Sequence, residues 1–174
     1  MILATKIDAQ QLSMEKEVNN CQIDNQILLL IASAERCNQR EIGYPYLISF
    51  NSKKEKEQAR KIANFKWIDN RTADCLDAKN CTEALTFLLK NKITNLDLGP
   101  YQLNYIYQKL PLQDYFNVKK SYEYACGLIY QNIKKYGYSW DTIAMYHSHT
   151  KKHKEKYLRI LSANIKKLKS GALK

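Results

Sequence analysis

The segment from Cys21 to Arg36 constrains the fold most, because it is the most apolar helix candidate in the chain. A helix that is apolar on nearly all sides is typical of a buried position. Its longest strongly apolar stretch, 27–32, is far shorter than the ~20 residues that a membrane-spanning helix needs. We therefore expect a buried helix and no membrane span. The apolar residues recur at intervals of three and four, at Ile23, Ile27, Leu30, Ile31 and Ala34, with Leu28 and Leu29 on the other side.

The rest of the sequence predicts a mainly α-helical single domain over residues 21–170, preceded by a polar N-terminal arm over residues 1–20. A length of 174 residues suits one domain with a sizeable core. At most a small β element is expected, near residues 44–51. Further helices are expected over residues 53–65 and over 82–91, the second capped by Thr82. Another should begin within 95–104 and end just before Pro111. Three more should follow the caps Asn117, Ser139 and Thr150, the first of them reaching residue 136.

The charge balance points to an anionic partner. Lys and Arg number 28 against 17 Asp and Glu, which gives a formal net charge of +11. Such a charge suits nucleic acid, an anionic lipid surface or the acidic polymers of a bacterial cell wall. The sequence has no cluster of arginines and no recognisable helix-turn-helix, so nucleic-acid binding ranks third among the functions considered and no nucleic acid is expected as a partner.

Five cysteines bear on the cellular compartment. Cys75 and Cys81 lie in a short polar loop, whereas Cys21 and Cys126 fall in expected helices, and neither spacing is the CxxC of a zinc ribbon. Disulfides in an oxidising compartment are the favoured interpretation, with five reduced thiols in the cytosol as the alternative. Because residues 1–10 lack the pattern of a signal peptide, the first interpretation implies that one has been removed.

Glu35 is the candidate acid. It follows Ile27 and Ile31 at intervals of four, so its carboxyl group continues the apolar face of the helix. Apolar surroundings penalise the charged form of a carboxylic acid and so favour a form that can donate a proton. The alternative is that Glu35 ends the helix and pairs with Arg36, Arg40 or a lysine.

Three segments in a fixed order extend the pattern around Glu35. They are Glu35-Arg36, the segment LDLGPYQLN at 96–104, and AMYHS at 144–148 followed by Tyr157. Over residues 21–160 this order resembles the lytic transglycosylases of the goose-lysozyme and soluble transglycosylase superfamily. The positions of Cys21 and Cys126 are similar to those of a cysteine pair in the small type that accompanies type IV secretion systems, such as the cag-type system.

The resemblance implies a lysozyme-like domain that cleaves peptidoglycan without a cofactor or metal. Glu35 would protonate the glycosidic oxygen between N-acetylmuramic acid and N-acetylglucosamine, and then accept the proton of the muramoyl C6 hydroxyl as a 1,6-anhydro end forms. Gln102 and Asn104 would contact substrate, and Tyr146 would orient Glu35. Tyr101 is the candidate for a sugar-stacking ring. Without the resemblance, a core tyrosine or a solvated amide would be the ordinary interpretation of these residues.

The resemblance also implies the setting in which such an enzyme works. Cys21 would pair with Cys126. Cys75 and Cys81 lie in an insertion relative to the family, and a separately expected bridge between them would leave Cys37 free. The protein would be periplasmic, with peptidoglycan glycan strands and components of a secretion apparatus as its partners.

Departures from the family pattern keep a second function open. Arg36 replaces a serine, Pro100-Tyr101 replaces Leu-Met, and His147-Ser148 replaces Asn-Ala. A lysozyme-like module that binds glycan or a secretion partner without cleaving is therefore the alternative. Asp97 could be a second carboxylate, although its place before Gly-Pro favours a role as the cap of the following helix.

Two other chemistries rank lower. His147, His149 and His153 have a spacing that zinc could use, but lysines crowd this segment. Cys37 could serve as a nucleophile with one of these histidines, although its position fits an unpaired thiol better.

Overall fold

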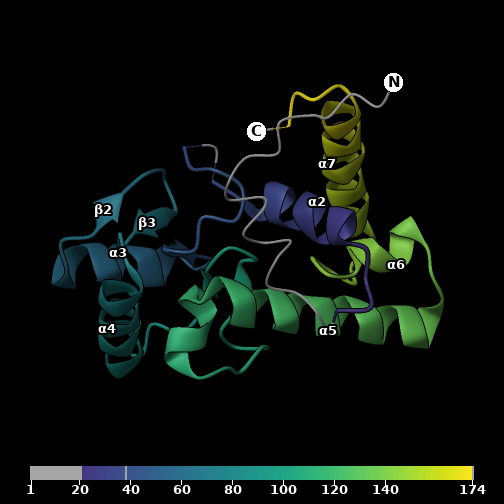
Figure 1. Cartoon of the computed structure of the whole chain (residues 1–174). Helices are drawn as coiled ribbons and strands as arrows, with labels where there is room; N and C mark the ends of the chain where they lie inside the picture. Colours follow the sequence, from purple (N-terminus) through teal and green to yellow (C-terminus); the bar gives the residue numbers. More distant parts are fainter. Residues whose placement is uncertain (1–20, 38, 174) are drawn as a thin grey trace. The chain divides into compact units, whose positions relative to one another are not determined.

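The structure is a computed structural model that describes residues 21–37 and 39–173 (Figure 1). The expected N-terminal arm, 1–20, lies outside the described residues. Helices make up about 54% of the described part, together with a small antiparallel sheet, so the mainly α class is confirmed. The contacts divide the chain into two compact units. Within the described residues, unit 1 comprises 21–34 and 122–173, and unit 2 comprises 35–37 and 39–121.

Unit 1 contains the helix expected to be buried. Helix α2 spans Asn25–Glu35, and only its last residue is assigned to unit 2. The Asp24 carboxylate accepts a hydrogen bond of 2.8 Å from the Gln26 backbone N–H and so caps the start of α2. The prediction of burial is confirmed, because the side chains on nearly all sides of α2 are buried: Ile27, Leu28, Leu30, Ile31, Ala32 and Ser33.

Within the described residues, unit 1 also contains two further helices and most of a third, and each begins directly after the residue predicted to precede it. Helix α5 (Val118–Tyr136) begins after Asn117, whose side-chain oxygen accepts from the Lys120 N–H. Helix α6 (Trp140–Ala144) begins after Ser139, whose hydroxyl accepts from the Thr142 N–H. Helix α7 (Lys151–Lys169) begins after Thr150, which makes no side-chain capping bond.

Two contacts hold α2 against α5. A disulfide joins Cys21, just before α2, to Cys126 on α5, with their Cα atoms 6.0 Å apart. The Tyr122 hydroxyl donates a hydrogen bond of 2.6 Å to the Asn25 side-chain oxygen. The start of α2 is therefore fixed by a covalent bond and by a hydrogen bond.

Unit 2 is built on a five-stranded antiparallel sheet with the strand order β2-β3-β1-β4-β5. The central strand β1 is buried along its whole length, and it pairs Ile48 with Ala73 on one side and with Leu98 on the other. The expected β element near 44–51 is therefore confirmed, and the sheet extends beyond it. The strands are β1 (Leu47–Phe50), β2 (Lys66–Trp67), β3 (Thr72–Asp74), β4 (Leu96–Leu98) and β5 (Leu103–Asn104).

Helices α3 (Lys53–Ile62) and α4 (Ala78–Lys90) accompany the sheet, with a 3-10 helix at Leu112–Phe116 (Figure 1). The prediction that Thr82 caps α4 is wrong. Asp77 is the cap, with its carboxylate accepting from the Asn80 N–H, and the Thr82 hydroxyl donates to the Ala78 carbonyl within the helix. A second disulfide, Cys75–Cys81, spans this start of α4.

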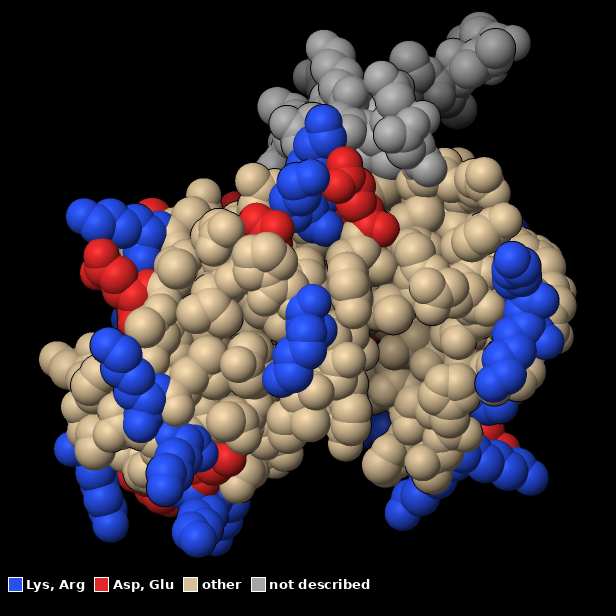
Figure 2. Space-filling view, turned by 90° about the horizontal axis from the view of Figure 1, so that it is seen from below, with Lys and Arg blue, Asp and Glu red and all other residues tan. Residues whose placement is uncertain are grey.

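Positive charge is visible on the surface. Figure 2 shows one face of the molecule, on which Lys and Arg side chains outnumber those of Asp and Glu. Within α7, Glu155 is the sole acidic residue among many lysines. No helix within the described residues is both long and apolar enough to cross a bilayer.

Candidate active site

Glu35 is the last residue of α2, at the end of its buried face. Ile27 and Ile31, two turns and one turn earlier, are 5% and 0% exposed. The Glu35 side chain is half-buried, and its Oε1 atom is withdrawn from solvent. The carboxyl group therefore continues the apolar stripe, as its spacing predicted. Arg40, one of the bases considered for it, pairs with Asp74 instead.

The segment 96–104 is a β-hairpin, so the prediction that a helix begins there is wrong. Leu96 and Leu98 are buried on either side of Asp97, which is the alternation of a strand, and Gly99 then turns the chain. Gly99 has a φ of +71°, and a Cβ atom there would lie 1.9 Å from the Tyr115 carbonyl oxygen. Only glycine fits this turn, which places Gln102 directly before β5 and Asn104 within it.

Gln102 adopts a backbone conformation that is unusual for its residue type. Its φ is +46°, in the left-handed region, and its side-chain amide donates a hydrogen bond of 2.9 Å to the Gly99 carbonyl oxygen. A residue other than glycine in this region is held there by its surroundings, and such positions cluster at ligand sites. The Gln102 side chain is half-buried.

Asp97 and Asn104 face each other across the hairpin. Their backbones are paired, and the Asn104 amide donates a hydrogen bond of 2.8 Å to Asp97 Oδ1. Arg71 lies 3.3 Å from Asp97 Oδ2 and also donates to the side chain of Asn51. The prediction that Asp97 caps a helix is therefore wrong, because no helix follows it. Its carboxylate instead joins a polar network on the sheet.

Tyr101 does not present a ring to a groove, contrary to the prediction. Its side chain is 0% exposed, among the largest fully buried side chains of the described chain. The turn over residues 99–102 directs Tyr101 into the core of unit 2 rather than into solvent. The packing interpretation holds for Tyr101, and any sugar-stacking ring must come from elsewhere.

Tyr146 lies in unit 1, in the turn after α6, and it is half-buried. Its predicted hydrogen bond to Glu35 joins residues of the two units and stays a prediction. Nearby, the His147 ring stacks on Tyr157 with centroids 4.6 Å apart, and His149 lies edge-on to Tyr136. The described residues contain no group of three or more His, Cys, Asp or Glu side chains placed to hold a metal ion.

Cys37 stands outside both disulfides. Burial raises the pKa of its thiol, and a contact of 3.4 Å with the Asp69 carboxylate acts in the same direction. A raised pKa lowers the thiolate fraction at neutral pH, which is unlike a catalytic nucleophile. Cys37 thus has the character of an unpaired thiol.

A buried ionic cluster in unit 2 was not foreseen from the sequence. Asp74 is 2% exposed and accepts hydrogen bonds from Arg40, from the Tyr44 hydroxyl at 3.0 Å and from the Leu76 N–H at 2.8 Å. Burial alone would raise the pKa of Asp74, but these hydrogen bonds outweigh it and hold that pKa below its ordinary value. Burial, together with the Asp74 charge, raises the pKa of Tyr44 to about 12.

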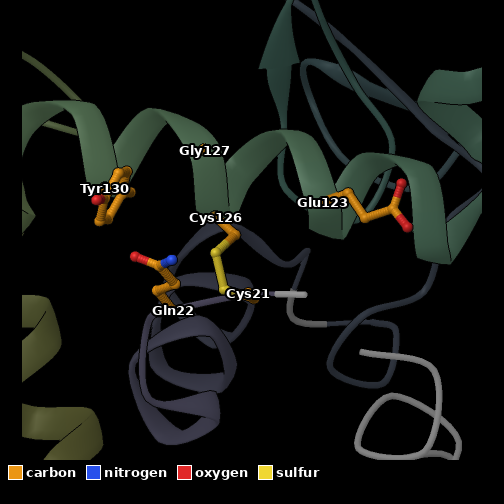
Figure 3. A pocket seen from close by; sticks show the side chains of 6 residues that line it. All are labelled: Cys21, Gln22, Glu123, Cys126, Gly127 and Tyr130. Carbon is orange, nitrogen blue, oxygen red and sulfur yellow. A yellow bond between two sulfur atoms is a disulfide. The ribbon is translucent and has the colours of Figure 1, made fainter. Parts of the chain in front are cut away.

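Two of the pockets formed by described residues lie within unit 1. The first, of about 470 Å³, is lined by the Cys21–Cys126 disulfide with Gln22, Glu123, Gly127 and Tyr130 (Figure 3). The second, of about 580 Å³, lies beside the first half of α2, away from Glu35. A comparison of the chain with protein-family models, with curated proteins and with solved structures finds no match in any of the three.

Proposed function

We propose that the protein is a peptidoglycan lytic transglycosylase with Glu35 as its acid and base. The observation that carries the proposal is the position of Glu35 at the end of the buried helix α2, with Oε1 withdrawn from solvent. A half-buried carboxyl group can exchange protons with a bound substrate while it is shielded from bulk water. The order of segments around Glu35, which resembles the transglycosylase superfamily, supports the same conclusion.

The reaction needs one carboxyl group. Protonated Glu35 donates its proton to the glycosidic oxygen of the β-1,4 bond between N-acetylmuramic acid and N-acetylglucosamine, and the bond to the anomeric carbon breaks. The muramoyl C6 hydroxyl attacks that carbon and gives its proton to the Glu35 carboxylate. The products are a 1,6-anhydromuramoyl end and a free C4 hydroxyl, and Glu35 is protonated again.

The engagement of Asp97 favours this route over hydrolysis by two carboxylates. A hydrolase of that kind uses a second Asp or Glu as a nucleophile or to activate water. Asp97 is the obvious candidate, but its two oxygens accept from Asn104 and Arg71. A carboxylate neutralised in this way is a weak nucleophile, whereas a transglycosylase takes its nucleophile from the substrate.

The setting of the enzyme follows from its disulfides and charge. Two disulfides indicate a protein that works outside the cytoplasm. Within the proposal this compartment is the periplasm, where the net charge of +11 attracts the carboxylated stems of the wall. The enzyme would open the wall locally for a secretion apparatus.

A glycan-binding module without cleavage is the second candidate, and one observation favours it. The side-chain amides of Gln102 and Asn104, expected to contact substrate, donate to Gly99 and Asp97 within the hairpin. These bonds give the two amides a structural role in the hairpin, which they can play without any cleavage.

Zymography on purified peptidoglycan separates the two candidates. The oxidised protein is expected to clear the gel, and Glu35→Gln to reduce clearing about 100-fold or more, because general acid–base catalysis is lost. Asp97→Asn should retain most of the activity. Mass spectrometry should find anhydromuramoyl ends, whereas reducing ends would indicate hydrolysis. Wall binding with no clearing by the wild-type protein would favour the module.

A further inference from the structure

The second pocket of unit 1 has the lining of a sugar site. Tyr138 and Trp140 stand at its rim with 68% and 42% of their surface exposed. Ser139 between them has an extended backbone (φ −160°, ψ 160°), so its two neighbours project to the same side of the chain. Two exposed aromatic rings on one side of a pocket offer flat faces on which pyranose rings can stack.

The floor and rim of this pocket supply complementary chemistry. Its apolar floor is formed by Ile27, Leu30, Ile165 and Leu168, and its polar groups are those of Asp24, Gln26 and Lys169. Carboxylate, amide and ammonium groups together provide acceptors and donors for hydroxyl and acetamido groups. Of the described lining residues one is acidic, Asp24, and one is basic, Lys169. This balance favours a neutral ligand over an anion.

The site is held in place before any ligand arrives. Ser139 caps α6, and Asp141 accepts a hydrogen bond of 2.6 Å from Lys154 on α7. On the opposite wall, the Asp24 carboxylate is fixed by the Gln26 N–H, and the start of α2 is anchored by the Cys21–Cys126 disulfide. Rigid support lowers the entropy that binding must overcome.

The other pocket of unit 1 does not share this chemistry. Among the described residues it is lined by the Cys21–Cys126 disulfide and by Gln22, Glu123, Gly127 and Tyr130, of which Tyr130 alone carries an aromatic ring (Figure 3). Paired rings and a charge-balanced rim distinguish the pocket at Tyr138 and Trp140.

We propose that this pocket is a second glycan site, which binds an N-acetylated sugar of the glycan strand through Tyr138 and Trp140. The proposal rests on the proposed function for its substrate class. Asp24 and Glu35 lie at opposite ends of α2, roughly 16 Å apart along the helix at 1.5 Å per residue, so the site is separate from the acid. A glycan strand bound at this pocket has a raised effective concentration at Glu35.

Trp140 can report on this site because the chain has two tryptophans, Trp67 in unit 2 and Trp140 in unit 1. In a Trp67→Phe, Glu35→Gln background the single indole N–H signal belongs to Trp140, and glycan is not cleaved. The full oxidised chain is titrated with tetra-N-acetylchitotetraose and followed by ¹H–¹⁵N spectra. A saturable shift of the Trp140 indole signal is expected.

Variants then locate the binding. Tyr138→Ala, at a largely exposed position, should weaken binding roughly tenfold, equivalent to the loss of about 1.4 kcal/mol. Trp140→Phe keeps an aromatic ring and should weaken binding less than Trp140→Ala. Tyr107→Ala is the matched control, because Tyr107 is 79% exposed and lies in unit 2, outside the pocket. The affinity of the Tyr107→Ala variant for the tetrasaccharide should equal that of the background chain.

Activity measurements separate this inference from the proposed function. With Glu35 intact, Tyr138→Ala should raise KM on long glycan strands with kcat unchanged, and should leave KM on short fragments unaltered. An unmoved indole signal, or equal affinity in all variants, would overturn the second site even if the wall is cleaved. Saturable binding with no cleavage would overturn the enzyme and leave the site standing. Binding of a sugar-free stem peptide in place of the tetrasaccharide would also overturn it.

Discussion

The Nε–H of Arg40 donates a hydrogen bond of 2.9 Å to Oδ2 of Asp74, at the end of strand β3. The Asp74 side chain is fully buried, whereas that of Arg40 is 24% exposed. A second guanidinium N–H of Arg40 also contacts Oδ2, and the Tyr44 hydroxyl donates to Oδ1. The pair therefore ties the chain that follows Glu35 to the sheet of unit 2.

Removal of Arg40 should destabilise the protein strongly. Arg40→Ala leaves the buried Asp74 carboxylate without its cation, and we expect the free energy of unfolding to fall by about 2–3 kcal/mol, less than for a fully buried pair because Arg40 is partly exposed. Tyr44→Phe is the matched control and should cost about 1 kcal/mol, since it removes one hydrogen bond. Urea unfolding measures both. Equal losses of unfolding free energy from Arg40→Ala and Tyr44→Phe would show that the ion pair contributes no more than a single hydrogen bond.

The same carboxylate should make stability depend on acid pH. Because the pKa of Asp74 is below its ordinary value in the folded protein, its contribution to stability is present above about pH 4, the range of an unfolded aspartate. It is lost as the pH falls through the folded-state pKa. The difference in unfolding free energy between the wild type and Asp74→Asn should therefore shrink as the pH is lowered below 4. A difference that stays constant with pH would disprove this linkage.

Two glycines should respond to alanine in opposite directions. Gly99→Ala places a Cβ atom 1.9 Å from the Tyr115 carbonyl oxygen at a φ of +71°, and should cost about 3 kcal/mol or more. Gly127→Ala, within α5, has nothing within 4 Å and should stabilise by about 1 kcal/mol through helix propensity. Thermal unfolding distinguishes them. Destabilisation by Gly127→Ala would mean that this position is more crowded than the structure shows.

The two disulfides should differ in their effect on stability. Cys21–Cys126 closes a separation of 105 residues and Cys75–Cys81 one of 6. From loop entropy we expect the paired serine substitutions to cost about 4.7 and about 2 kcal/mol, respectively. Urea unfolding of the two double variants tests this order. A larger loss from Cys75→Ser with Cys81→Ser would show that local anchoring of α4 outweighs loop entropy.

Helices whose caps and periodicity agree could be predicted from the sequence. Asn117 and Ser139 precede α5 and α6 as expected, and the apolar spacing around Ile27 and Ile31 correctly predicted a buried α2. In these segments local hydrogen bonding and the position of apolar residues favour the same structure.

The hairpin that carries Gln102 was mistaken for a helix because Pro100 is tolerated in a first helical turn. The alternation of Leu96, Asp97 and Leu98 before Gly99 was the signal for a strand, but it is short. Tyr101 was misassigned for the same reason, since its direction depends on the turn.

The Arg40–Asp74 pair could not be predicted. Its partners lie 34 residues apart and meet only when β3 joins β1. The pocket at Tyr138 and Trp140 likewise depends on α2 and α7, which are distant in sequence.

The Cys75–Cys81 bridge has a consequence for limited proteolysis. Leu76 lies inside the small ring that this disulfide closes. It is 53% exposed and has a φ of 72°, so the segment is accessible to a protease. A cut within 76–80 would leave the two fragments linked through sulfur. The nicked chain would run as one band until a reducing agent is added, and α4 would remain tethered to the sheet after its peptide connection is gone.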